Sequence, residues 1–172
     1  RYMSARSDEI RSFRNAIRRY TDYYNELLSL ADGRHRELAL SGMLSESFVM
    51  SIAVLWEGFV YDLLLACIVA APSKYALNLQ RRVTESLNTR FGKSISQLVR
   101  FSRPTRPRIS SVTSLIDPEG HNLAFPSAEK LVERSNEWLS ARYARKFASL
   151  SAGDQNFINF LIAIRNYLGH RS

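Results

Sequence analysis

The sequence contains a single cysteine, Cys67, among its 172 residues. An internal disulfide is therefore impossible, and a chain of this length buries enough apolar surface to fold without disulfide or metal staples. Because the cysteine lies in an apolar run, it fits a reducing compartment, and we expect a cytoplasmic protein. The opening residues, RYMSARSDEI, are charged and lack the apolar stretch of a signal peptide. The length predicts one domain over residues 1–172, although a start at Arg1 and an end at Ser172 suggest a piece of a longer protein.

Several patterns that are typical of enzyme sites are missing. The sequence has no glycine-rich phosphate loop, no nucleophile elbow and no cysteine and histidine pair of the protease type. His35 and His121 lack ligand-like spacing with each other or with Cys67, so we expect no zinc site and no bound cofactor. No internal repeat and no strand-like alternation of apolar residues is found either.

Proline is scarce outside one stretch. Four of the five prolines fall between residues 102 and 126, a segment also rich in serine and arginine. This composition predicts a long loop or insertion between the central and C-terminal helices, holding at most an irregular turn. At its start, RFSRPTRPR carries a run of arginines that could grip RNA through its phosphates: Arg100, Arg103, Arg106 and Arg108. A solvated loop, or a docking segment for an acidic partner, is the alternative.

The rest of the chain has the apolar spacing of helices. We expect helices over about 5–31 and 35–70, one or two shorter helices over 74–101, helix again over 127–150, and a last one after the capping pair Ser151 and Asp154. The second is apolar nearly all round and long enough to suggest a membrane span. Glu57 and Asp62 near its middle would be costly in a bilayer, so a central core helix explains it better. The sequence therefore predicts an all-α bundle with no membrane contact.

Acidic residues are fewer than basic residues in this chain. The formal charge is +8, and 20 of the 24 basic residues are arginine. The planar guanidinium matches phosphate better than the lysine ammonium does, so this excess favours a polyanionic partner, most simply nucleic acid. A generally basic protein without such a partner would have the same composition.

The last helix ends in RNYLGH, which spans Arg165 to His170. We expect its core stripe to be formed by Phe157, Leu161, Ile164 and Leu168. Relative to that stripe, Asn159, Asn166 and His170 fall on the opposite face, and Arg165 lies about 140° around the axis from His170. Arginine and histidine could then meet on one substrate if Gly169 loosened the helix end, or if a second copy supplied its own motif across a two-fold axis. We favour the dimer. Solvated polar residues that complement a helix C-terminus remain the simpler explanation.

RNYLGH resembles the arginine, four to six residues, histidine signature that closes the last helix of HEPN domains, with Asn166 at the position of their frequent asparagine. The segment VLWEGFVYDLL is similar to the tryptophan and glutamate helix of HEPN branches from bacterial toxin and defence systems. Together these segments cover about a third of the chain. Two features depart from the family pattern: Gly169 stands where alanine is more frequent, and the 102–126 loop has no counterpart.

The resemblance implies a HEPN-like bundle and a metal-independent endoribonuclease that works as a dimer. Arg165 would then bind the scissile phosphate, His170 would act as general base or acid, and Asn166 would orient the histidine or hold the phosphate. By the same analogy, Glu57 would support Arg165 or His170, with Tyr61 one turn further on the same face; a plain ion pair with another arginine is the alternative. A toxin or defence effector with a cognate antitoxin or nucleotidyltransferase partner follows from the resemblance alone.

Two other function classes stay open. The first is a HEPN module that binds RNA or scaffolds a partner protein without catalysis. The second is a structural helical domain with no role in nucleic acid binding.

Overall fold

The computed structural model describes residues 2–31, 37–87, 89, 92, 107–117, 119–120 and 124–170. Over these ranges the fold is all-α, as predicted, with no strand. The helices are α1 (Tyr2–Ala31), α2 (Glu37–Ala70), α3 (Ser73–Ser86), α5 (Ile109–Ile116), α6 (Ala128–Trp138), α7 (Ala141–Ala148) and α8 (Ala152–Gly169).

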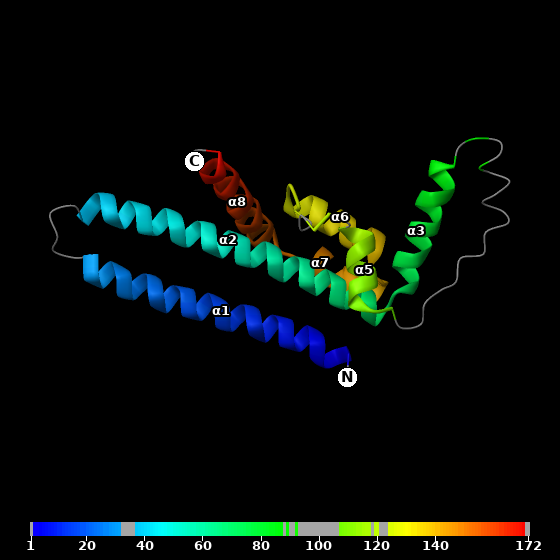
Figure 1. The fold of residues 1–172 in the computed structure, drawn as a ribbon, viewed down its shortest axis with the longest axis horizontal. Coiled ribbons are helices and arrows are strands. Elements are labelled where there is room, and N and C mark those ends of the chain that lie inside the picture. The colour runs from blue at the N-terminus through cyan, green and yellow to red at the C-terminus, as the bar shows by residue number, and fades with distance from the viewer. Residues whose placement is uncertain are drawn as a thin grey trace.

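The two long helices α1 and α2 form an antiparallel hairpin, and α3 lies beyond one end of it (Figure 1). Aromatic pairs tie them together: Phe13 stacks on Phe59 with ring centroids 4.3 Å apart, and Tyr24 stacks on Phe48 at 4.4 Å. The Tyr24 hydroxyl also shares a 2.8 Å hydrogen bond with Ser45. Such offset stacks add to the burial of the rings, so they fix the register of the hairpin at two points.

The main core lies around the C-terminal half of α2. Leu64 and Ile68 are fully buried there, and α3, α5, α6 and α7 gather at this end of the hairpin (Figure 1). Tyr75 of α3 meets Trp138 of α6 edge to face at 5.5 Å. The C-terminal part of the apolar run that suggested a membrane span thus belongs to this core.

A membrane reading of α2 rests on length and composition alone. The span Ala39–Ala70 is long and apolar enough to cross a bilayer, and the core helices of soluble proteins meet the same criterion. In this fold 44% of its most apolar window is buried against the rest of the chain.

Helix α8 packs on α2 and α6 through a second, smaller core. Ile158 and Ile162 of α8 contact Ala128 at the start of α6, and Trp56 of α2 joins this cluster to the main core. The helix begins with the expected capping box, in which the Ser151 hydroxyl accepts from the Asp154 amide and the Asp154 carboxylate accepts from the Ser151 amide. The capping box fixes the residue at which α8 begins.

Two expectations about the helices are corrected, and a third is tested only in part. The 102–126 segment is not loop throughout, because α5 forms within it, where residues 109–116 contain no proline and Val112 is buried. The expected 127–150 helix breaks at Leu139, whose extended backbone turns the chain from α6 into α7 while its side chain is buried. Of the one or two short helices expected over 74–101, α3 forms over Ser73–Ser86, and residues 93–101 lie outside the described residues.

The acidic end of the hairpin gives a prediction about stability. Burial raises the pKa of Asp62 above its ordinary 3.8, and burial and the charges of Asp62 and Asp8 raise the pKa of Glu9. When folding raises the pKa of a carboxyl group, the protein loses stability as pH rises from the unfolded-state pKa towards the folded-state pKa. The loss of stability is complete above the folded-state pKa. Asp62→Asn should therefore raise the free energy of unfolding at pH 7 by less than about 1 kcal/mol for so exposed a group, and the melting temperature should rise with it. The gain should vanish below pH 3.8. A lower melting temperature of the variant at pH 7, measured by calorimetry, would contradict this.

Candidate functional site

The guanidinium of Arg165 is held between two side chains. Its Nη1 donates to both carboxylate oxygens of Glu57, at 2.5 and 2.6 Å, and thereby joins α8 to α2. Its Nε and Nη2 donate to Oδ1 of Asn166, at 3.2 and 2.7 Å. The exposed fractions of the two charged side chains are 26% for Arg165 and 18% for Glu57. A guanidinium has five N–H donors, so these four contacts leave a donor for a further acceptor.

Arg165 points towards α2 because α8 buries another face than the one predicted from the sequence. The buried residues are Ile158, Leu161 and Ile162, whereas Phe157 is 58% exposed. The predicted stripe was wrong at Phe157, since the sequence FINFLIAI is apolar on nearly every side and does not reveal which side is covered. The true face is turned by about 90°, which carries Arg165 inwards to α2.

Asn159 has a structural role that the sequence did not reveal. Its Oδ1 accepts the Ala128 amide at 2.8 Å, and its Nδ2 donates to Glu129 at 3.3 Å. Asn159 therefore caps the first turn of α6, one of whose amides would otherwise lack an acceptor. Asn159 lies on the same side of α8 as Asn166 and His170, as the sequence predicted, but its amide group binds α6.

His170 lies at the C-terminal end of α8 and is exposed. Its amide donates to the carbonyls of Asn166 and Leu168, and its backbone is still in the helical region. The helix thus stays regular through Gly169, which gives no support to a loosened helix end. On such a helix the Arg165 and His170 side chains point about 140° apart, so one copy alone does not aim both at one atom.

Of the other predicted residues, Tyr61 is buried on α2 one turn from Glu57. Burial raises the pKa of Tyr61 above its ordinary 10.0, and the other groups that act on it are Thr113, Asp117 and Asp62. Two of these belong to α5 and its C-terminal end, so the phenol faces α5 and not Arg165. Tyr61 thus supports the packing of α2 and does not contact the guanidinium.

The predicted arginine grip is described at one position only. Arg108 is exposed and precedes the first turn of α5. Arg100, Arg103 and Arg106 lie outside the described residues.

An exposed apolar face runs along α8 beside the motif. Phe157, Phe160 and Tyr167 are 58%, 55% and 59% exposed. Their spacing of three and seven residues puts them on one side of the helix, and His170 falls at the edge of that side. Large apolar side chains that line up in this way mark a surface for association.

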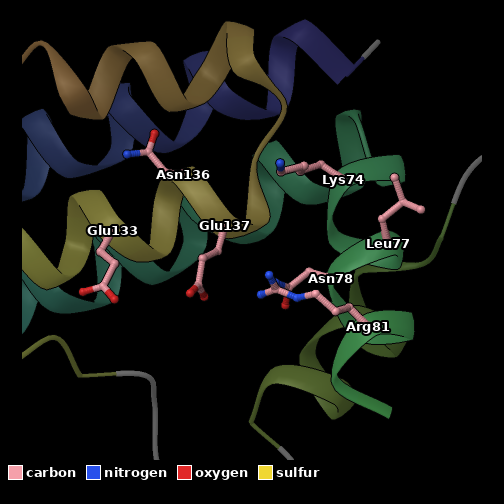
Figure 2. A pocket seen from close by; sticks show the side chains of 7 residues that line it. All are labelled: Lys74, Leu77, Asn78, Arg81, Glu133, Asn136 and Glu137. Atoms are coloured by element: carbon pink, nitrogen blue, oxygen red, sulfur yellow. The ribbon is translucent and has the colours of Figure 1, made fainter. Parts of the chain in front are cut away.

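A cleft of about 450 Å³ lies elsewhere, between α3 and α6. Figure 2 shows Arg81 of α3 facing Glu137 of α6 across it, with Asn78 behind. Oδ1 of Asn78 is buried and has no hydrogen-bond partner among the described residues. None of the residues that the sequence predicted as functional lines this cleft.

The Glu57 contact can be tested by its effect on stability. Glu57→Gln keeps the shape but removes the charge opposite a half-buried guanidinium, so we expect a loss of about 1–3 kcal/mol in the free energy of unfolding. The matched control is Glu85→Gln, which breaks the exposed Arg81–Glu85 pair at 3.7 Å. That change should cost less than about 0.5 kcal/mol. Urea denaturation gives both values, and equal losses would contradict a special role for Glu57.

Comparison with known proteins gives no assignment: no family model, no curated protein and no solved structure matches the chain.

Proposed function

We propose that the protein is a HEPN-type endoribonuclease that cleaves RNA without a metal ion, at a site completed by two copies of the chain. The observation that carries the proposal is the pre-oriented guanidinium of Arg165, which is held by Glu57 of α2 and Asn166 of α8. Arg165 lies on the same helix, α8, that ends at the exposed His170. The motif resemblance of RNYLGH supplies the reaction class.

The chemistry assigns one task to each side chain. Arg165 uses its remaining N–H donor on a nonbridging oxygen of the scissile phosphate and stabilises the charge that develops there. His170 removes the proton of the ribose 2′-hydroxyl, or protonates the leaving 5′-oxygen. The 2′-oxygen then attacks phosphorus and the bond from phosphorus to the 5′-oxygen breaks, which gives a 2′,3′-cyclic phosphate. DNA has no 2′-hydroxyl and is not a substrate.

Glu57 and Asn166 are positioning residues in this scheme. Between them they engage the Nε, Nη1 and Nη2 atoms of Arg165, so its plane is fixed before RNA binds. A guanidinium that is already oriented loses less conformational entropy when it takes up a phosphate.

The second copy is needed because of helix geometry. Arg165 points towards α2 while His170 lies on another side of the same helix end, so one scissile phosphate receives both groups only if the histidine comes from a neighbouring chain. The exposed face with Phe157, Phe160 and Tyr167 is the surface that we assign to this contact. A two-fold axis through it brings the two motifs to one basic cleft.

A toxin or defence effector that acts in the cytoplasm is the biological setting that we propose, with an antitoxin or a nucleotidyltransferase as the cognate partner. This part rests on the sequence resemblance alone.

A non-catalytic module that binds RNA or scaffolds a partner is the second candidate. The ion pair of Arg165 with Glu57 favours this candidate, because a guanidinium whose charge is neutralised by a carboxylate can hold α8 on α2 without taking part in a reaction.

One experiment separates the two candidates. Purified protein is incubated in EDTA with a single-stranded RNA and with the DNA of the same sequence, and the products are resolved on a denaturing gel. Cleavage of the RNA alone, with cyclic phosphate ends, is the expected result. Tight binding without cleavage would replace the enzyme by the binding module.

A further inference from the structure

Helix α2 has a side that its neighbours do not cover. The helix is apolar nearly all round, yet α1 packs on one side of it, and α8 packs on the side that bears Glu57. On the remaining side Val54, which lines the seam with α1, is 58% exposed. A helix that is apolar on every side is stable in water only when every side is covered.

Two hollows follow this uncovered side along the seam between α1 and α2. One, of about 90 Å³, has Tyr20, Tyr23, Leu27 and Leu44 in its lining. The other, of about 220 Å³, has Glu9, Ala16, Val54, Gly58 and Asp62 in its lining. Because the hairpin is antiparallel, the two hollows lie end to end, and we call them together the hairpin groove.

The dimensions of the hairpin groove suit a helix. From Glu9 to Leu27 it extends for about 27 Å, at 1.5 Å per residue, which is the length of about 18 helical residues. Tyr20 and Tyr23 are 41% and 60% exposed at its rim, and tyrosine is enriched where proteins bind each other. A third helix in this seam would pack on both partners by ridges and grooves, as in other helical bundles.

The charge of the hairpin groove is opposite to that of the whole chain. Glu9 and Asp62 line one end, and Asp8 follows on the same rim of α1. The helical phase puts Glu26 on that rim as well, with Arg19 as its basic neighbour. The arginines of α1 at positions 11, 14 and 18 fall on the opposite side of the helix. An acidic apolar groove thus occurs in a chain of net charge +8.

The charges of Asp62 and Asp8 lie close enough to Glu9 to oppose its ionisation. The pKa of Glu9 is raised by burial first and then by the charges of Asp62 and Asp8, and burial raises the pKa of Asp62. A cation beside them would relieve both effects.

We propose that the hairpin groove binds a basic amphipathic helix of a partner protein, with the apolar side of that helix on Val54 and Tyr20 and its lysines or arginines against Glu9 and Asp62. A second copy of this chain fits less well, because it would bring an equal set of carboxylates and a further net charge of +8 to the same face. The inference does not depend on ribonuclease activity.

The test uses synthetic helices as probes. An 18-residue peptide with leucine at i, i+3, i+4 and i+7 and lysine on the other positions is labelled with fluorescein, and its affinity is compared by anisotropy with that of the same peptide carrying glutamate for lysine. Non-specific attraction to a +8 protein favours the acidic peptide. The hairpin groove favours the basic one, and we expect it to bind at least tenfold more tightly and to weaken as salt increases.

Three variants locate the binding. Val54→Arg and Asp62→Lys should each reduce the affinity for the basic peptide at least tenfold, whereas Leu115→Arg, at a position 60% exposed on α5, should leave it unchanged. Circular dichroism verifies that all three are folded. Equal or tighter binding of the acidic peptide, or an unchanged affinity of Val54→Arg, would overturn the proposal. Conversion of a dimer to a monomer by Val54→Arg in sedimentation would overturn it in favour of a second copy.

Discussion

Arg165→Ala and His170→Ala should each lower the rate of RNA cleavage by about 10²–10⁴-fold, the usual contribution of a positioned acid or base or of an electrostatic stabiliser. The Arg165 variant loses the group that holds the phosphate, and the His170 variant loses the proton acceptor. Cleavage is measured in EDTA with an end-labelled single-stranded RNA at saturating enzyme, so that weaker binding does not pass for slower chemistry.

Two controls make this result specific. His170 is exposed at the end of α8, so its replacement should leave the free energy of unfolding almost unchanged. Arg165→Ala leaves Glu57 without its partner and destabilises the fold, so Arg165→Lys is run beside it, because it keeps the charge but loses the fork of the guanidinium. Activity equal to that of the parent in the His170 variant would remove the histidine from the mechanism.

A mixture of the two inactive variants tests the shared site. If each site takes its arginine from one copy and its histidine from the other, half of the dimers in a statistical mixture are mixed, and each has one intact site. The mixture should recover about one quarter of the parent activity. No recovery, with mixed dimers shown by native mass spectrometry, would mean that both groups act from one chain.

Phe160→Glu should abolish dimers and RNA cleavage together. Phe160 is 55% exposed at the centre of the apolar face of α8, so a charge there costs little in the folded monomer. In a packed two-fold contact the same charge is buried opposite its own symmetry mate. Even truncation of an aromatic residue at the centre of an interface costs about 2 kcal/mol or more of binding free energy. Sedimentation velocity measures the dimer, and the gel assay measures cleavage.

The matched control for Phe160 is Leu115→Glu. Leu115 is 60% exposed on α5 and lies outside the α8 face, so its variant should stay dimeric and active. A monomeric Phe160→Glu protein that cleaves RNA as fast as the parent would contradict the composite site, although cleavage itself would stand.

How much of this fold follows from the sequence depends on the contrast between apolar and polar sides in each helix. In α1 the contrast is strong, and Phe13 and Tyr24, which stack on α2, lie eleven residues or about three turns apart on its apolar side. In α8 the contrast is weak, so Phe157 was assigned to the core and lies in solvent. Helix α5 was missed because prolines on both sides hid a short proline-free run that is anchored by the buried Val112.

The site shows the same limit. From the sequence, Glu57 was expected to support Arg165 or His170, or to pair with another arginine, and a charge in an apolar helix does require a partner. Which partner it has depends on how α8 is rotated about its axis, and that rotation is set by the packing of Ile158 and Ile162 on Ala128 and Trp56. Tertiary packing of this kind leaves no local signal, and neither does the Asn159 cap on α6.

That cap makes the departure of the last helix costlier than its own contacts suggest. If α8 lifted away, the Ala128 amide would lose its acceptor, and the first turn of α6 would fray at a cost of about 0.5–2 kcal/mol. The segment that bears Arg165 and His170 and the start of α6 therefore open as one unit, and hydrogen exchange at that single amide would report whether the terminal segment is seated.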